Sequence, residues 1–139
     1  QKTNPPPNLA CRCFTHSTET ILWAKKNDKK SRHFFDYQKM KEMNGGKQMK
    51  DVWTGALTKP SEKTEGKHPT QKPEYLLEKI VLASTEEGQV ILDPFCGSGT
   101  TGVEAVRFGR KFIGIDVSEE YLEISKRRLE KVYGDAKEY

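Results

Sequence analysis

A glycine-rich loop constrains the fold of this 139-residue chain more than any other feature. Residues 97–102 read GSGTTG and match the spacing G-x-G-x-x-G, in which glycines permit a tight turn and a close approach of the backbone to a ligand. The apolar run at 89–92, directly before the loop, predicts a short buried strand. The pattern over 101–108, ended by Gly109, predicts a helix directly after it. The loop is therefore expected to join a strand to a helix and to bind a nucleotide cofactor.

The segments around this unit continue an alternation of helices and strands. Apolar positions from Leu76 to Ala83 follow helical spacing, which predicts a helix over about 74–84. A second strand is expected over 111–115, and a helix capped by Ser118 is expected to run to about residue 132. Alternation of this kind implies parallel strands joined by right-handed crossovers. We predict a partial α/β fold of Rossmann-like type, with parallel strands and flanking helices, over residues 67–139.

The first 66 residues have a different character. Residues 19–24 combine β-branched and aromatic side chains, and we interpret them as a buried strand at the end of a subdomain over 1–24. From 25 to 66 the pattern loses its periodicity, and isolated aromatic residues stand among many lysines. Long segments of this kind are usually functional or disordered, and the scattered aromatics argue against simple disorder. We expect an irregular insertion with a function of its own.

Charge is distributed unevenly along the chain. Between Lys25 and Lys72 there are thirteen Lys or Arg and six Asp or Glu, whereas nine and thirteen follow from Pro73 to the end. A basic segment beside a less basic body is typical of proteins that bind a phosphate backbone. A solvated lysine-rich loop is the alternative that charge alone leaves open.

Composition disfavours several other classes of protein. No apolar run approaches the roughly 20 residues of a membrane-spanning helix, so no membrane partner is expected. The odd number of cysteines gives no disulfide framework, and Cys11 and Cys13 lack a second pair at zinc-finger spacing. We therefore expect no metal site and a reducing, cytoplasmic location. The chain begins at Gln1 without a signal peptide, and we interpret it as one domain cut from a longer protein.

Two aspartates narrow the choice of ligand for the loop. Asp93 stands at the carboxyl end of the first strand, where its carboxylate would repel the pyrophosphate of a dinucleotide. An ammonium or sulfonium group would be attracted instead, and Asp116 after the next strand can accept hydrogen bonds from a ribose. No lysine follows the last glycine, so no P-loop is present. S-adenosyl-L-methionine (AdoMet) carries the matching groups and is the predicted cofactor, with NAD as the remaining alternative.

Several ordered motifs resemble those of DNA amino-methyltransferases. The string DPFCGSGTTG over 93–102, the string FIGID over 112–116 and the string HPTQKP over 68–73 look like those of the bacterial and archaeal N6-adenine and N4-cytosine enzymes. Their order is similar to that of the beta class, in which the cofactor loop follows the target-recognition region. The block over 12–23 is also similar to the segment that precedes this region there. The resemblance covers nearly the whole chain.

The resemblance implies a role for each motif. Residues 93–101 would surround the methionine part of AdoMet, Asp116 would hold the ribose, and Val117 would lie near the adenine. Thr70 and Lys72 would be donors to the carboxylate of the cofactor. The predicted cofactor-binding residues are His68, Thr70, Gln71, Lys72, Asp93, Phe95, Cys96, Gly97, Ser98, Gly99, Thr100, Thr101, Asp116 and Val117. We interpret Cys96 as a packing residue and not as a nucleophile.

Residues 25–66 would then be the target-recognition insertion for double-stranded DNA. The predicted phosphate contacts are Lys25, Lys26, Lys29, Lys30 and Arg32. Tyr37 and Trp53 would pack this insertion or a base.

The catalytic motif of such enzymes is expected outside this chain. They use Asp, Asn or Ser followed by Pro-Pro and an aromatic residue, which holds the target amino group and stacks on a base that has left the duplex. Residues 4–7 read NPPP, but Pro7 offers no aromatic face. We therefore predict no catalytic residue here and expect the motif upstream, in an N-terminal half of the same enzyme. A homodimer is the other partner considered.

The resemblance implies methyl transfer from AdoMet to an exocyclic amino group of DNA in a site-specific, restriction-modification type of enzyme. Adenine N6 is the preferred target and cytosine N4 the alternative. The chain by itself is expected to be inactive. A non-catalytic fragment that binds AdoMet or DNA beside a separate catalytic chain, and an NAD-dependent oxidoreductase, remain alternatives.

Overall fold

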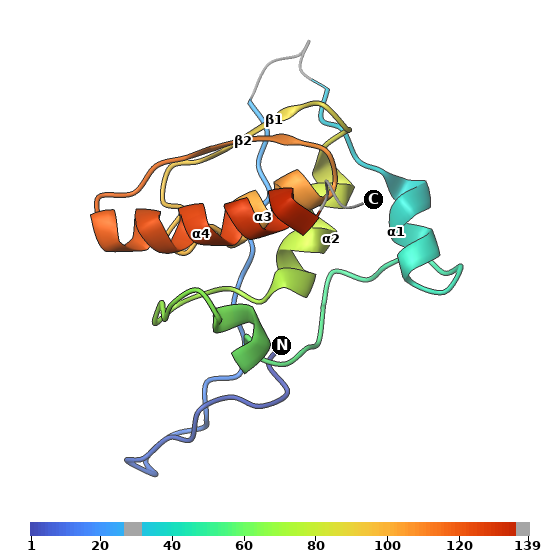
Figure 1. Ribbon diagram of the computed structural model, residues 1–139. Helices are drawn as coiled ribbons and strands as arrows, with labels where there is room; N and C mark the ends of the chain where they lie inside the picture. The colour runs from blue at the N-terminus through green and yellow to red at the C-terminus, as the bar shows by residue number, and fades with distance from the viewer. Residues whose placement is uncertain (27–31, 136–139) are drawn as a thin grey trace.

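The computed structural model describes residues 1–26 and 32–135. The elements in chain order are α1 (Tyr37–Met43), the 3-10 helix η1 (Pro60–Lys63), α2 (Glu74–Ser84), β1 (Val90–Asp93), α3 (Thr100–Arg107), β2 (Lys111–Gly114) and α4 (Glu119–Asp135), as Figure 1 shows. From α2 onward, helices and strands alternate in the predicted order. A helix suited to crossing a bilayer is absent from this described part of the chain.

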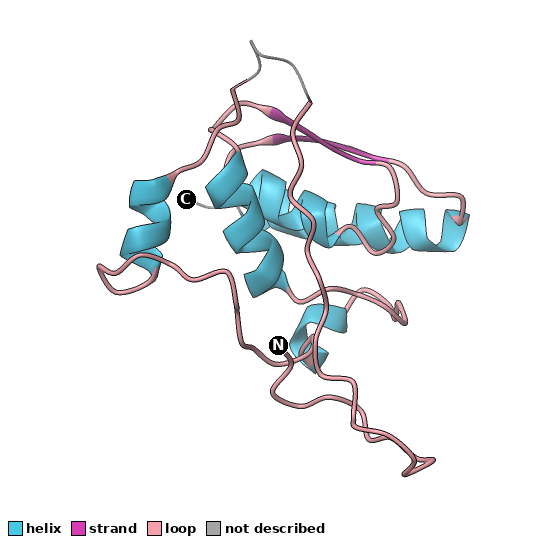
Figure 2. Cartoon of the chain, turned by 180° about the vertical axis from the view of Figure 1, so that it is seen from behind, coloured by secondary structure: helices cyan, strands magenta, loops and turns pink. Residues whose placement is uncertain are grey.

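The strands β1 and β2 form a parallel pair, with Val90 opposite Lys111 and Asp93 opposite Gly114. The helix α3 connects the two strands and packs against both. Figures 1 and 2, taken from opposite sides, both show α2, α3 and α4 on the same side of the pair. The prediction of a partial Rossmann-like fold with parallel strands is confirmed.

The opposite face of the strand pair is exposed. Val90 and Leu92 are each 58% exposed and Ile113 is 53% exposed, whereas the sequence predicted a buried strand over 89–92. That prediction was wrong because alternate side chains of a strand point to opposite faces, and helices cover only one face of this pair. The strand begins and ends one residue later than predicted.

The covered face is tightly packed at Gly102 in α3. A Cβ at this position would lie 2.5 Å from the ring of Phe112 in β2. Val103 and Ala105 of the same helix are buried. The last glycine of the loop motif therefore lets α3 approach the strands closely, which is the role that the motif assigns to it.

The helix α1 lies inside the segment for which the sequence predicted little secondary structure. Asp36 caps it, because its Oδ1 accepts a hydrogen bond from the Lys39 amide at 2.8 Å. Met40 is buried and packs with Leu82 and Ala83 of α2. The insertion is thus irregular over much of its length but holds one short helix against the body of the protein.

The helix α4 begins as predicted. The Ser118 hydroxyl accepts a hydrogen bond from the Tyr121 amide at 3.3 Å, as expected of an N-cap residue. The helix continues to Asp135, slightly beyond the predicted end at residue 132. The prediction for α2, over 74–84, is matched by the observed Glu74–Ser84.

The N-terminal segment does not form the predicted strand. Ile21 is 51% exposed, Leu22 89% and Trp23 61%, and residues 19–24 have no regular secondary structure. A buried strand needs partners for both edges and cover for its faces. No described strand forms backbone ladder hydrogen bonds with this segment. The prediction of a buried strand over 19–24 was therefore wrong for this chain. The chain start lies instead against residues 55–57, where the Asn4 side chain accepts a hydrogen bond from the Leu57 amide at 2.8 Å.

Candidate functional site

A cavity of about 170 Å³ lies at the carboxyl end of β1. Two segments that are distant in the sequence form its walls, namely residues 68–72 before α2 and residues 93–101 around the glycine loop. The lining residues are His68, Thr70, Gln71, Lys72, Leu77, Asp93, Phe95, Cys96, Gly97, Ser98, Thr100 and Thr101. Among the predicted cofactor residues, only Gly99, Asp116 and Val117 are not part of this lining. The two predicted motifs thus meet at one site.

The glycine loop needs two left-handed backbone positions. Gly97 has φ 50° and Gly99 has φ 73°, a region that other L-residues enter at a cost. A Cβ at Gly99 would lie 2.1 Å from the Ser125 hydroxyl of α4, and a Cβ at Gly97 would lie 2.9 Å from Nε2 of His68. The loop is therefore held between α4 on one side and the His68 ring on the other.

Asp93 is held in place at the entrance of the loop. Its Oδ1 accepts a hydrogen bond from the Phe95 amide at 3.1 Å, and its Oδ2 accepts one from the Thr101 hydroxyl at 2.7 Å. A carboxylate has about four lone-pair positions, so each oxygen can accept a further bond. Asp93 thus presents an oriented acceptor on the wall of the cavity.

Asp116 closes the loop from the end of β2. It accepts hydrogen bonds from the Gly97 amide at 2.8 Å and from the Ser118 amide at 3.0 Å. These backbone donors, Ser118 first and then Gly97, hold the pKa of Asp116 below its usual range. Asp116 is therefore an anion beside the cavity, and Val117 next to it is fully exposed.

The His68 ring covers the loop from the other wall. Its Nδ1 accepts a hydrogen bond from the Thr70 amide at 3.3 Å. The ring centroid lies 4.2 Å from that of Tyr121 in α4, with the planes at 65°. His68 is thus fixed by a turn on its own segment and by an aromatic contact to α4.

Lys72 is already engaged by a carboxylate. Its Nζ lies 3.1 Å from Glu19, and Nζ of Lys2 lies 2.8 Å from the same side chain. The hydrogen bond from Lys2, followed by that from Lys72, lowers the pKa of Glu19. Two ammonium groups therefore share one carboxylate, so a positive charge remains at this wall of the cavity.

Gln71 contributes a buried acceptor to the cavity lining. The residue is 8% exposed, and its Nε2 donates a hydrogen bond to the Glu62 carbonyl at 2.6 Å. Its Oε1 has no hydrogen-bond partner among the described residues. A buried acceptor without a donor is costly, and this oxygen has almost no accessible surface.

Cys96 is buried behind the loop. Burial raises the pKa of its thiol, and the carboxylates of Asp93 and Asp116 act in the same direction. A thiol that stays protonated is a poor nucleophile, which agrees with the predicted packing role.

The residues of α4 that support the site were not predicted from the sequence. Ser125 contacts Gly99, Tyr121 contacts His68, and the buried Arg128 donates hydrogen bonds to Ser98 and Thr100. They lie three or four residues apart, so they share one face of the helix. An arginine in the otherwise buried stripe of an amphipathic helix was the signal that could have found Arg128.

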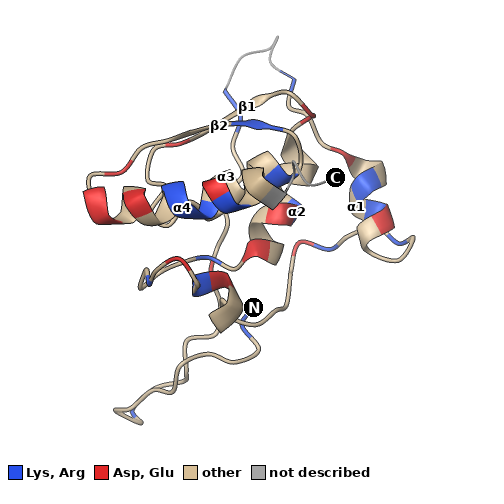
Figure 3. Cartoon of the chain, in the orientation of Figure 1, with Lys and Arg blue, Asp and Glu red and all other residues tan. Residues whose placement is uncertain are grey.

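The predicted DNA-binding residues lie in another region of the molecule. Lys25, Lys26 and Arg32 are exposed, and Figure 3 shows basic residues on both sides of the segment that is not described. Lys29 and Lys30 lie outside the described residues. In the described part of this region, the centroid of the Trp23 ring lies 5.3 Å from that of His33 and 5.3 Å from that of Phe35. Exposed aromatic and basic side chains therefore occur together here.

The other predicted aromatics of the insertion lie apart from this cluster. Trp53 donates a hydrogen bond to the Lys50 carbonyl at 2.7 Å, and Nζ of Lys79 lies 5.5 Å from its ring centroid. Tyr37 is 47% exposed at the start of α1. Trp53 thus contacts other residues of the protein. This is compatible with the prediction that it packs the insertion, which was one of its two predicted roles.

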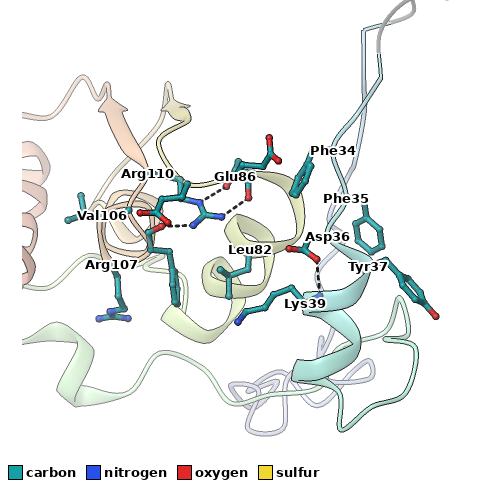
Figure 4. Close-up of a pocket in the computed structure, with 14 residues that line it drawn as sticks. Phe34, Phe35, Asp36, Tyr37, Lys39, Leu82, Glu86, Val106, Arg107 and Arg110 are labelled. Atoms are coloured by element: carbon teal, nitrogen blue, oxygen red, sulfur yellow. Dashed lines mark hydrogen bonds between the residues drawn. The ribbon is translucent and has the colours of Figure 1, made fainter.

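A larger hollow of about 920 Å³ lies at the other end of the strands (Figure 4). Its inner wall carries Arg110, which donates hydrogen bonds to Thr85 and to the Phe108 carbonyl, and Phe34 and Phe35 lie on the opposite side. Ligands of open α/β sheets bind at the carboxyl ends of the strands. The guanidinium of Arg110 is also used in holding α2 and α3 together. The smaller cavity is therefore the better candidate site.

The parallel strands, the glycine loop at the carboxyl end of β1 and the aspartate after β2 define part of a Rossmann-like methyltransferase fold. A solved structure described as the M1.HpyAVI-SAM complex has a TM-score of 0.69 and 36% sequence identity, over 92% of this chain and 57% of that chain. The PvuII DNA methyltransferase (cytosine-N4-specific) has a TM-score of 0.59 and 25% identity, over 73% of this chain and 40% of that chain.

The sequence gives a narrower assignment than the fold. The profile of the N6_N4_Mtase family, described as DNA methylase, matches residues 1–127. The type II methyltransferase M2.LlaDCHI of Lactococcus lactis subsp. cremoris is 75% identical over 131 residues, which cover 94% of this chain and 49% of that protein. The chain belongs to this DNA methylase family. It spans about half the length of the curated relatives that it matches.

Proposed function

We propose that this chain binds AdoMet in the cavity between residues 68–72 and 93–101 and forms the methyl-donor side of a DNA amino-methyltransferase. The observation that carries the proposal is the meeting of these two segments at the carboxyl end of β1. Such an edge is where α/β proteins bind nucleotide cofactors. The M1.HpyAVI structure to which the chain is similar is a complex with SAM.

The chemistry of the walls fits AdoMet. Asp93 is an acceptor suited to an ammonium group, because each of its oxygens can accept a further bond. The shared charge of Lys2 and Lys72 suits a carboxylate. Small-molecule pockets usually measure about 300–1,000 Å³, so a cavity of about 170 Å³ suits the methionine end, with the nucleoside directed outward to Asp116.

NAD fits the same walls less well. Its pyrophosphate would have to approach the carboxylate of Asp93 at the carboxyl end of β1, and two like charges at close range repel each other. Asp116 beside the loop adds a second anion, which backbone hydrogen bonds keep ionised. The oxidoreductase alternative is therefore disfavoured.

When bound, AdoMet would supply a methyl group on a sulfonium: the amino nitrogen of a base would bond to the methyl carbon as the carbon–sulfur bond breaks, which would release S-adenosylhomocysteine and one proton from the amino group. The residues of this chain bind and orient that donor. The glycine loop allows close approach of the backbone, Asp93 and Asp116 offer oriented acceptors, and His68 covers the loop. Holding a reactant in one orientation lowers the barrier by reducing the entropy that must be lost.

The acceptor side is proposed to involve DNA and a catalytic motif that residues 4–7 do not supply. Asn4 is used in binding Leu57 and is not part of the cavity lining. The exposed Lys25, Lys26 and Arg32 beside Trp23 suit a phosphate backbone and an unstacked base. We propose adenine N6 as the target. Cytosine N4 is the second candidate, because the similar PvuII enzyme is cytosine-N4-specific.

Calorimetry with AdoMet and NAD in parallel tests the donor site. Binding of AdoMet and no binding of NAD is expected, and a preference for NAD would refute the proposal.

An assay with labelled AdoMet and double-stranded DNA tests whether this chain supplies only the methyl-donor side. The chain alone should transfer no label, and addition of a polypeptide with the Pro-Pro-aromatic motif should restore transfer. Digestion to nucleosides would distinguish N6-methyladenine from N4-methylcytosine.

The same assay distinguishes the partner arrangements. If the chain alone transferred methyl groups as a homodimer, sedimentation would show a dimer and the proposed separation of donor and acceptor sides would be wrong. If AdoMet and DNA bound but no added polypeptide restored transfer, the chain would be a non-catalytic binding fragment.

A further inference from the structure

Arg128 is a buried cation at the centre of the molecule. It lies in α4 and is 6% exposed. Its Nη1 donates a hydrogen bond to the Ser98 carbonyl at 2.8 Å and to the Thr100 hydroxyl at 3.0 Å. Its Nη2 donates one to Oε1 of Glu74 at 2.9 Å. One guanidinium therefore contacts residues from two separate parts of the chain, the glycine loop and the start of α2.

Ser98 and Thr100 belong to one wall of the candidate site, and Glu74 adjoins the other. Ser98 and Thr100 are part of the glycine loop and line the cavity. Glu74 is the first residue of α2 and directly follows the segment 68–73, which includes the other wall. Because the guanidinium is planar and rigid, Nη1 on one wall and Nη2 on the other set the spacing between them.

Further polar contacts hold the Glu74 side chain and backbone in place beside Arg128. Its Oε2 also accepts a hydrogen bond from Arg107 at 3.1 Å, and its amide donates one to Glu62 at 2.9 Å. A buried cation is costly unless it is paired and hydrogen-bonded. Among the described residues, Arg128 meets this condition through Ser98, Thr100 and Glu74, so its burial depends on the glycine loop and the start of α2 being in place.

We propose that Arg128 is a positioning residue that fixes the glycine loop relative to the segment before α2 and so shapes the methyl-donor site. The inference rests on the proposed function only for the identity of the ligand. Arg128 is separated from the cavity by its partners and acts through them.

The test compares Arg128→Lys and Arg128→Gln in the full chain with Lys126→Gln. Lys126 is an exposed residue of the same helix, so its substitution controls for loss of a positive charge on α4. Amide NMR shifts and hydrogen exchange without ligand report the walls directly. We expect the amides of Gly99, Thr100 and Glu74 to shift and to exchange faster in both Arg128 variants, while Gly45 and the Lys126→Gln chain stay unchanged.

Calorimetry with AdoMet then measures the effect on binding. Hydrogen bonds to charged groups contribute enough that the affinity should fall by about tenfold or more in Arg128→Gln. Arg128→Lys should recover only part of it, because a lysine cannot bridge the two walls with a planar fork. Unchanged wall amides and unchanged affinity in both variants would overturn the proposal, and so would equal losses in Lys126→Gln.

These experiments distinguish a failure of the proposed function from a failure of the proposed role of Arg128. If the parent chain did not bind AdoMet, the proposed function would fail, but the ligand-free NMR comparison would still decide the role of Arg128. If Arg128→Gln failed to fold, Thr100→Val and Glu74→Ala weaken the two ends of the bridge separately. Thr100→Val removes the hydroxyl that Nη1 contacts and keeps the Ser98 carbonyl, and Glu74→Ala removes the carboxylate that Nη2 contacts. Each should shift the amides of the opposite wall, and a shift confined to the substituted wall would overturn the proposal.

Discussion

At position 99, both the backbone conformation and the packing limit which residue can be accommodated. The φ of Gly99 is 73°, and its missing Cβ leaves room for the Ser125 hydroxyl. Either constraint alone would favour glycine. Their combination makes this position the most sensitive one in the loop.

We expect Gly99→Ala to destabilise the chain and to weaken AdoMet binding. The left-handed backbone costs a non-glycine residue about 1–2 kcal/mol, and the contact with Ser125 adds to this. Gly45→Ala is the matched control, because Gly45 has φ 65° and no atom within 4 Å of its missing Cβ. Urea unfolding should show a larger loss for Gly99→Ala. Equal losses would show that the contact with α4 is unimportant.

Glu104 is a carboxylic acid enclosed between α2 and α3. It is 0% exposed. Burial, together with the carboxylates of Glu74 and Glu78, raises the pKa of Glu104 to about 7 against the opposing effect of Arg107. The folded state therefore binds a proton that the unfolded state releases near pH 4.5.

This difference predicts a specific pH dependence of stability. The contribution of Glu104 is present below about pH 4.5 and is lost as the pH rises through about 7. Glu104→Gln removes the titrating group and should abolish this loss. The difference in free energy of unfolding between the variant and the parent should therefore move in favour of the variant by about 2–3 kcal/mol from pH 5 to pH 8. Urea unfolding over this range measures it. The exposed Glu86→Gln should run parallel to the parent, and parallel curves for Glu104→Gln would contradict the prediction.

The site was predictable from the sequence where its residues are adjacent in the chain. The strings over 68–72 and 93–101 each form one wall, so their local motifs identified most of the cavity lining. Ser125 and Arg128 could not be identified this way. Their roles depend on how α4 is rotated against the loop, which packing of the whole unit decides.

Among the elements, those with strong local signals were predicted best. The bounds of α2 follow from Pro73 and a regular apolar spacing, and the start of α4 follows from Ser118. The helix α1 was missed because its seven residues carry little periodicity, and it is stabilised mainly by Met40 against α2. The segment over 19–24 has the composition of a strand, but composition cannot supply the neighbouring strands that burial requires.

The cap of α1 gives a test at this scale. We expect Asp36→Ala to lower the free energy of unfolding by about 1 kcal/mol, since it removes the bond to the Lys39 amide. The affinity for AdoMet should not change, because α1 does not contribute to the cavity. Asp51→Ala, at an exposed position outside the helix, should have little effect on either quantity. A loss of AdoMet affinity in Asp36→Ala would show that the insertion and the cofactor site are coupled.

For the molecule as a whole, we expect the uncovered face of the strand pair to influence behaviour in solution. Val90, Leu92 and Ile113 lie together on this face and are more than half exposed. Adjacent exposed apolar side chains on a sheet favour association.

We expect the isolated chain to bind a hydrophobic dye and to self-associate as its concentration rises. Leu92→Thr combined with Ile113→Thr should reduce both effects with little loss of stability, because the side chains are already exposed. Val52→Thr is the control, since Val52 is 67% exposed but lies away from the strands. Sedimentation velocity and dye fluorescence measure the outcome. Equal association in all three chains would exclude the strand face as its cause.

The helix α2 begins directly after one wall of the cavity, and β1 returns the chain to the other wall. Its eleven residues therefore act as a spacer of about 16 Å. Substitutions on its outer surface leave the two walls in register. A single inserted residue would turn everything beyond it by about 100° and move the glycine loop away from His68. In this helix, the outer side chains are therefore free to vary, whereas the number of residues is not.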